Sequence, residues 1–230
     1  MSAITLQNAL DSSSYYLGES GTPSSETTKR TLFANEAKEY MRNLRNWTWE
    51  EKAGTPINIV SGTTKYTLAS DLKNAKAIKW LTVTDTSGNV VYYTPVSEQD
   101  FNAIVNQSQT DQVYYVSGNP INGYTVQINP SPSANVTNGL NYAYYAAESD
   151  FVNTTDTTNI PKRELIGWYI AAKVLYGYRE QAQYQLAMQN FNNMVEDAAN
   201  EDMKKAPYEN SQIQNFRQYM GFPTNFRNYY

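Results

Sequence analysis

The spacing of apolar side chains changes twice along this chain of 230 residues, and these changes constrain the fold more than any other feature. In residues 1–55 apolar positions recur every three or four residues, as on one face of a helix. Residues 56–150 instead hold short β-branched and aromatic runs, and helical spacing returns in residues 160–205. We therefore predict an α+β fold, in which N- and C-terminal helices form a bundle and an antiparallel β-rich region is inserted between them.

The N-terminal part predicts two helices. Apolar residues at positions 4, 6 and 10 indicate a short opening helix, which glycines and a proline then interrupt. Thr22 followed by Pro23 has the pattern of an N-cap and a first helical residue. From there the apolar stripe continues, and we expect this second helix to end near Trp49.

The C-terminal part predicts long helices that pack on the N-terminal ones. Pro161 fits the first position of a helix, Gly177 indicates a kink or joint, and the last helix should stop before Pro207. The apolar stripes of both parts are typical of a shared core. The predicted helix core consists of Phe33, Tyr40, Leu44, Trp47, Leu165, Trp168, Tyr169 and Ala172.

The middle region predicts an antiparallel sheet or a small sandwich, interrupted by one helix. Residues 86–89 and 119–123 have the composition of turns between strands. Ser97 should cap a short helix that reaches Val105, with Asp100 at the capping-box position. The expected strands are residues 57–60, 65–68, 77–83, 90–94, 113–116, 124–128 and 140–145.

Composition excludes much chemistry, because the chain has no Cys and no His. Disulfides, thiolate metal sites, cysteine nucleophiles and Ser-His-Asp triads are all excluded, and we expect no enzyme, no metal and no cofactor. Only 17% of residues are charged, whereas 20 are Tyr, a composition suited to wide contact surfaces. A pI near 5.0 argues against direct nucleic-acid binding.

The sequence predicts neither a secretory signal nor a membrane-spanning segment. The first ten residues lack the basic and apolar regions of a secretory signal, so folding in a cytoplasm is expected. The most apolar stretch, residues 165–178, is too short to span a bilayer and contains Lys173. We expect no membrane association.

Three kinds of candidate site deserve consideration in or near the β region. A pair of carboxylates could act as a glycosidase dyad, although turn and cap roles explain them better; the candidates are Asp85, Asp100, Asp111, Glu148 and Asp150. Asp156 with Thr157 and Thr158 could contact a cation, although a solvated loop is the simpler interpretation. Neighbouring tyrosines could form a sugar platform, but only half of them can share one face of a strand; they are Tyr92, Tyr93, Tyr114, Tyr115, Tyr142, Tyr144 and Tyr145.

The last segment, residues 206–230, differs from the rest in composition. It combines Asn, Gln, Gly221 and Pro223 with spaced aromatic side chains, and it cannot form a core of its own. We expect an extended tail that becomes ordered on another subunit. The predicted contact residues are Phe216, Tyr219, Phe222, Phe226, Tyr229 and Tyr230.

The order of elements and four local motifs resemble a known family. These motifs are KYTLASDL at residues 65–72, YTPVSEQDF at 93–101, VYYV with NPINGYTVQINP within 113–130, and NIPKRELIGWYIAAK at 159–173. With these motifs, residues 24–205 resemble the head-to-tail adaptors of tailed bacteriophages, also called head-completion or connector ring proteins. None of the motifs is a catalytic signature.

The resemblance implies a structural protein of the virion, assembled in the host cytoplasm. It implies a homo-oligomeric ring, dodecameric like the portal, which docks under the portal and prolongs the DNA ejection channel toward the tail. The implied partners are the portal protein and a downstream tail or second ring protein, while DNA passes without specific binding. In related adaptors the C-terminal segment reaches the portal, and residues 216–230 match it here. The alternative is a carbohydrate-binding or hydrolytic tail component.

Overall fold

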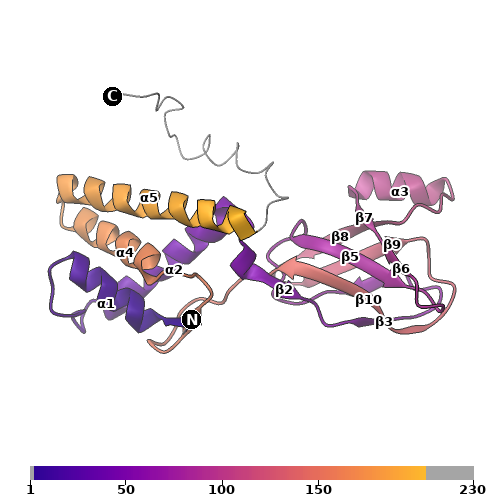
Figure 1. Ribbon diagram of the computed structural model, residues 1–230, viewed down its shortest axis with the longest axis horizontal. Helices are drawn as coiled ribbons and strands as arrows, with labels where there is room; N and C mark the ends of the chain where they lie inside the picture. The colour runs from indigo at the N-terminus through magenta and orange to yellow at the C-terminus, as the bar shows by residue number, and fades with distance from the viewer. Residues whose placement is uncertain (1–2, 206–230) are drawn as a thin grey trace, which may run out of the picture. The chain divides into compact units, whose positions relative to one another are not determined.

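The computed structural model describes residues 3–205 and shows an α+β fold, which confirms the predicted fold class (Figure 1). The chain forms two compact units. Of the described residues, 3–49 and 148–205 make the first, here called the helical unit, and Glu50–Ala147 make the second, here called the β unit. The β unit is thus an insertion between the N- and C-terminal parts of the helical unit.

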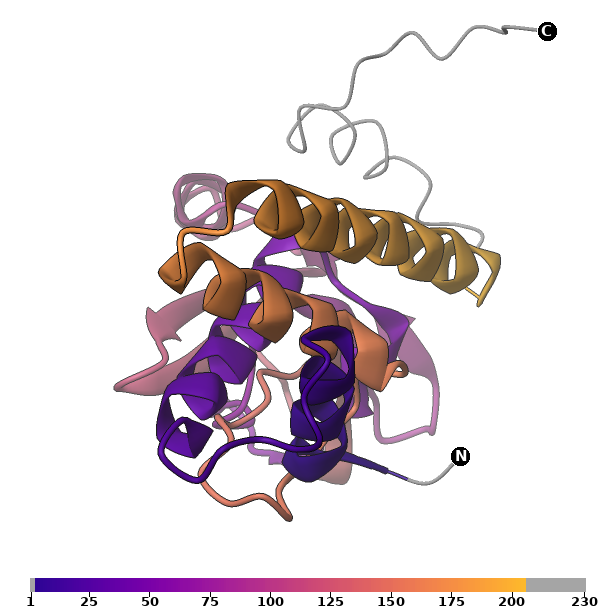
Figure 2. The ribbon, with the colours of Figure 1, turned by 90° about the vertical axis from the view of Figure 1, so that its left-hand side faces the viewer.

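Helix α4 (Arg163–Gly177) is the centre of the helical unit. It packs against α1 (Leu6–Tyr16), α2 (Thr27–Leu44) and α5 (Gln181–Lys205), as Figure 2 shows. Its buried side chains face several directions, as expected for a helix that is surrounded by others. At Gly167 an added Cβ would lie only 2.7 Å from the Cβ of Ser12, so the glycine permits the close approach of α1.

The predicted start of α2 at Thr22 and Pro23 is wrong, because α2 begins at Thr27 with Glu26 at its N-cap. The amide of Glu26 donates to the carbonyl of Pro23 in a separate turn. The hydroxyl of Thr22 lies 2.9 Å from that of Ser14, in α1, and is therefore used in a contact between helices instead of a cap.

The predicted end of α2 near Trp49 is also too late, since α2 ends at Leu44 and Arg45 is extended. The indole of Trp47 turns back and donates to the carbonyl of Met41 at 2.7 Å, while its ring stacks on that of Trp49 at 4.2 Å. This arrangement satisfies a carbonyl of the last helical turn and buries the indole completely. A 3-10 turn, Thr48–Glu50, follows.

The segment that precedes α4 differs from the prediction as well. Pro161 lies before the helix, whose N-cap is Lys162. The residues ahead of it are held in a short strand pair, in which β11 (Thr157–Thr158) pairs with β1 (Ile4–Thr5). Gly177 does mark a joint, because α4 ends there and Arg179 has a φ of 61° before α5 begins.

The β unit consists of two sheets. The first has the order β2-β10-β5-β6, with β3 also paired to β10, and the second has the order β4-β9-β8-β7. The strands are β2 (Glu51–Ala53), β3 (Ile57–Ile59), β4 (Lys65–Thr67), β5 (Ile78–Thr84), β6 (Val90–Tyr92), β7 (Thr94–Pro95), β8 (Val113–Asn119), β9 (Gly123–Asn129) and β10 (Val136–Tyr145). Helix α3 (Glu98–Asn106) lies between β7 and β8 in the chain.

Several local predictions for the β unit are confirmed. Residues 86–89 connect β5 to β6, and residues 119–123 connect β8 to β9. The hydroxyl of Ser97 accepts from the amide of Asp100 and caps α3. One expectation is wrong, since β7 and β8 are parallel: α3 carries the chain across between them.

The core of the β unit contains side chains from both sheets. Leu81 and Leu140 of the first sheet and Val126 and Ile128 of the second are fully buried in the same cluster. A smaller cluster forms where Phe101 of α3 packs on β8. The two sheets therefore pack face to face, and α3 lies against the second one.

Candidate interaction surfaces

Seven of the eight predicted helix-core residues lie in or pack against one cluster of the helical unit, and the eighth, Ala172, is buried in α4. Trp47, Leu165, Tyr169 and Ala172 are buried. The other four side chains are partly buried and pack against the same cluster; they are Phe33, Tyr40, Leu44 and Trp168. Two of these rings are neighbours, with the centroid of Tyr40 6.2 Å from that of Tyr169.

The carboxylates of Asp85 and Asp100 have local structural partners. Asp85 accepts from the amides of residues 87 and 89 and from the side chain of Asn89, and these bonds, that of the Asn89 side chain foremost, lower the pKa of Asp85. Asp100 accepts from Ser97 Oγ at 2.6 Å at the start of α3. Asp111 is exposed at the surface. These contacts support the turn and cap roles rather than a hydrolytic pair.

Glu148 and Asp156 organise the loop that leads to β11. Glu148 accepts from Thr158 Oγ1 at 2.7 Å, and Asp156 accepts from the amides of residues 152 and 153 at 2.7 Å. Those backbone bonds lower the pKa of Asp156. Asp150 is exposed nearby in sequence. Within residues 3–205 no cluster of three acidic side chains could hold a metal ion.

Most of the candidate tyrosines are buried, so they cannot stack against a sugar. Of the seven candidates only Tyr92 is exposed, because the inward faces of the two sheets and the contact with α3 take the others. Burial raises the pKa of Tyr114 to about 12. Burial and the hydrogen bond to Asp71 raise the pKa of Tyr144. These seven tyrosines therefore form no open platform for a sugar.

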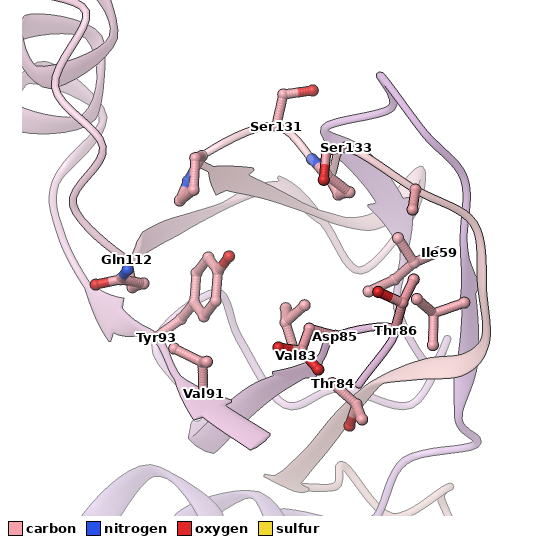
Figure 3. A pocket seen from close by; sticks show the side chains of 14 residues that line it. Ile59, Val83, Thr84, Asp85, Thr86, Val91, Tyr93, Gln112, Ser131 and Ser133 are labelled. Atoms are coloured by element: carbon pink, nitrogen blue, oxygen red, sulfur yellow. The ribbon is translucent and has the colours of Figure 1, made fainter. Parts of the chain in front are cut away.

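A cavity of about 250 Å³ lies in the β unit (Figure 3). Tyr93 and Gln112 lie on one side and Ile59 on the other, and the loop with Ser131 and Ser133 crosses above them. The walls also include one carboxylate, that of Asp85, which already accepts a hydrogen bond from the backbone amide of Asn89 in the turn. The cavity accordingly offers apolar contact and a hydroxyl rim, but no pair of groups for acid–base catalysis.

Exposed apolar side chains gather on β6 and its neighbour. All three residues of β6 are exposed, with Tyr92 at 71%, and Trp80 of β5 is exposed at 38%. The register pairs Thr82 with Tyr92, so Tyr92 and Trp80 lie on the same face of the sheet. We did not expect this surface from the sequence, although the absence of charge from residue 86 to residue 97 was a visible signal.

Comparison with protein families gives one match. The family model described as SU10 adaptor protein matches residues 4–214. The chain belongs to the SU10 adaptor family. The match covers both units of the adaptor, and a comparison with curated proteins gives no match.

Family membership gives the adaptor a structural role in a bacteriophage, as a component of the virion that contacts other head and tail proteins. It favours a non-enzymatic function. Among residues 3–205 of the adaptor, no helix is both long enough and apolar enough to cross a membrane. The predicted tail contacts, Phe216 to Tyr230, lie outside the described residues.

Proposed function

We propose that this adaptor forms a dodecameric ring under the phage portal, extends the DNA channel and connects the capsid to the tail. The family match over residues 4–214 is the observation that carries the proposal. The adaptor acts without a cofactor or an enzymatic step, and it is assembled onto the head in the host cytoplasm. Its further partner is a downstream tail protein or a second ring protein.

The distribution of charge in the β unit supports a passage for DNA. All five Lys of this unit lie between residues 52 and 79, and residues 80–147 contain no Lys or Arg. The four acidic residues of that stretch are exposed; they are Asp85, Glu98, Asp100 and Asp111. Carboxylates repel phosphates, so DNA can slide past a channel wall lined by residues of this stretch without adhering.

The C-terminal segment is the proposed contact with the portal. Its residues 206–230 combine seven aromatic side chains with only three charged residues. Aromatic side chains are the usual anchors of protein interfaces. In this proposal they enter apolar sites on the portal, while the ring itself is held by contacts between the described units.

Electron microscopy of the adaptor mixed with purified portal rings tests the proposal. The expected result is a second ring stacked coaxially on the portal, with the portal's symmetry. A monomer in the absence of portal is compatible with this, because assembly can depend on the docking surface. If the portal rings stay bare at micromolar adaptor concentration, the proposal is wrong.

A further inference from the structure

Strand β6 is the open edge of the first sheet. The amide of Asp85 donates to the carbonyl of Asn89, and the amide of Tyr93 donates to the carbonyl of Leu81. In an antiparallel ladder successive residues alternate in direction, so the backbone groups of Val90 and Tyr92 point away from β5. No strand among residues 3–205 pairs with that side.

Compared with the other sheet edges of the β unit, β6 is unprotected. β4 carries the exposed Lys65, β7 consists of two residues that include Pro95, and β2 carries Glu51 and Lys52. Charged residues, prolines and short length are the usual means by which soluble proteins prevent edge pairing. β6 has the sequence Val-Val-Tyr, and no charged residue occurs from residue 86 to residue 97.

The opposite edge of the same sheet has a second uncharged strand, β3. Within the described part of the chain it pairs only with β10, and residues 54–64 contain no charged side chain. The register places Ile57, Leu140, Val83 and Val91 in one row on the inner face of the sheet. Val91, at the end of this row, is still 36% exposed, so the apolar row is unfinished at the β6 edge.

We propose that β6 of one copy pairs with β3 of the next copy, so that the first sheet continues from subunit to subunit. This inference rests on the proposed ring. Two different edges on opposite sides of one sheet make a heterologous contact, the kind that a ring of identical subunits requires. The pairing places Ile57 of the next copy beside Val91 and completes the inner row.

Strand direction and charge both agree with this pairing. β3 and β5 are each antiparallel to β10, and β6 is antiparallel to β5, so β3 and β6 run in opposite directions. Copies in similar orientations therefore present antiparallel edges, like the pairs within the sheet. Because the chain has a net charge of −4, copies repel one another in general, and two uncharged edges offer a contact that avoids this repulsion.

Cysteine cross-linking tests the pairing directly, because the chain contains no Cys. With Val91 opposite Ile57, antiparallel pairing places Val90 opposite Asn58, at a Cα separation of about 5.5 Å that a disulfide can bridge. The variant Asn58→Cys/Val90→Cys, assembled with portal and oxidised, should give a ladder of covalent oligomers. The matched variant Thr67→Cys/Val90→Cys uses the β4 edge and should give none.

A charge on the edge provides a second measurement. Val90→Lys puts an ammonium on an exposed side chain, so the fold should persist by circular dichroism while rings on the portal are lost. Thr67→Lys on β4 should leave the rings intact. The pairing is wrong if rings form without the 58–90 cross-link, if Val90→Lys rings persist, or if Val90→Cys alone gives dimers. If wild-type adaptor forms no ring on the portal, the proposed function fails, and this inference fails with it.

Discussion

Asp202, close to the end of α5, accepts a hydrogen bond from the backbone amide of Thr48, with 3.0 Å between the two atoms. The carboxylate also forms an ion pair with Arg45 at 3.2 Å, and its side chain is fully buried. Thr48 begins the turn through which the chain leaves the helical unit, and residues 206–230 follow directly after α5. One buried carboxylate thus links the end of α5 to the turn through which the chain leaves the helical unit.

Asp202→Ala should destabilise the protein by about 3–5 kcal/mol, because it removes a buried carboxylate that pairs with the buried Arg45. Asp202→Asn should cost less, since the amide oxygen still accepts from Thr48. Urea unfolding followed by circular dichroism measures both. Asp197→Asn, an exposed substitution in the same helix, is the control, and equal effects for Asp197 and Asp202 would contradict the assignment.

The contacts of Glu26 should make the stability of the protein depend on pH in the acid range. Hydrogen bonds from Tyr178 and from the buried Arg30 lower the pKa of Glu26. A carboxyl with a lowered pKa in the folded state stabilises it above the unfolded pKa of about 4.3, and this contribution is lost as the pH falls through the folded value. The stability of Glu26→Gln should therefore fall less than that of the wild type as the pH is lowered from neutral to about 3.

Urea midpoints at a series of pH values from neutral to about 3 test this prediction. Glu39→Gln is the control, because Glu39 is an exposed carboxylate of the same helix. It should follow the wild-type profile. Parallel profiles for wild type and Glu26→Gln would show that the contacts of Arg30 and Tyr178 do not favour the ionised carboxyl.

The burial of Tyr114 should make the protein less stable at alkaline pH. Burial raises its pKa to about 12, so the folded state keeps the phenol neutral while the unfolded chain ionises near pH 10. The contribution is fully present below about pH 10 and is lost as the pH rises toward 12. Tyr114→Phe should flatten this decline in urea unfolding, whereas Tyr92→Phe, at an exposed ring, should leave it unchanged.

The sequence predicted those features that depend on local spacing. The stripe from Phe33 to Leu44, the hairpin turn before Val90 and the cap at Ser97 follow from periodicity and turn chemistry, and the structure contains each of them. The helix start at Thr22 was wrong because its hydroxyl contacts α1. A long-range contact of this kind cannot be seen in a single segment.

The contact surface was less predictable for the same reason. Whether Val90–Tyr92 is a central or an edge strand depends on which strands lie beside it, and the strand order β2-β10-β5-β6 is a property of the whole sheet. The burial of Arg30 could not be predicted either. Its partner Glu19 lies in the loop between α1 and α2, and the sequence does not show that this loop folds back onto α2. The many tyrosines suggested surfaces for contact with other proteins. Most tyrosines of the strands are instead buried in the core.

The last prediction concerns the C-terminal segment. Replacing Phe216, Tyr219, Phe222 and Phe226 together by Ala should weaken binding to the portal ring by about a hundredfold or more, because aromatic anchors carry most of the energy of such contacts. The fold should not change, since these positions follow α5. A matched variant replaces four polar residues of the same segment by Ala, at positions 210, 212, 214 and 215. Binding assays with immobilised portal compare the two variants. Undiminished docking of the aromatic variant, or an equal loss in both, would show that the aromatic side chains are not the anchors.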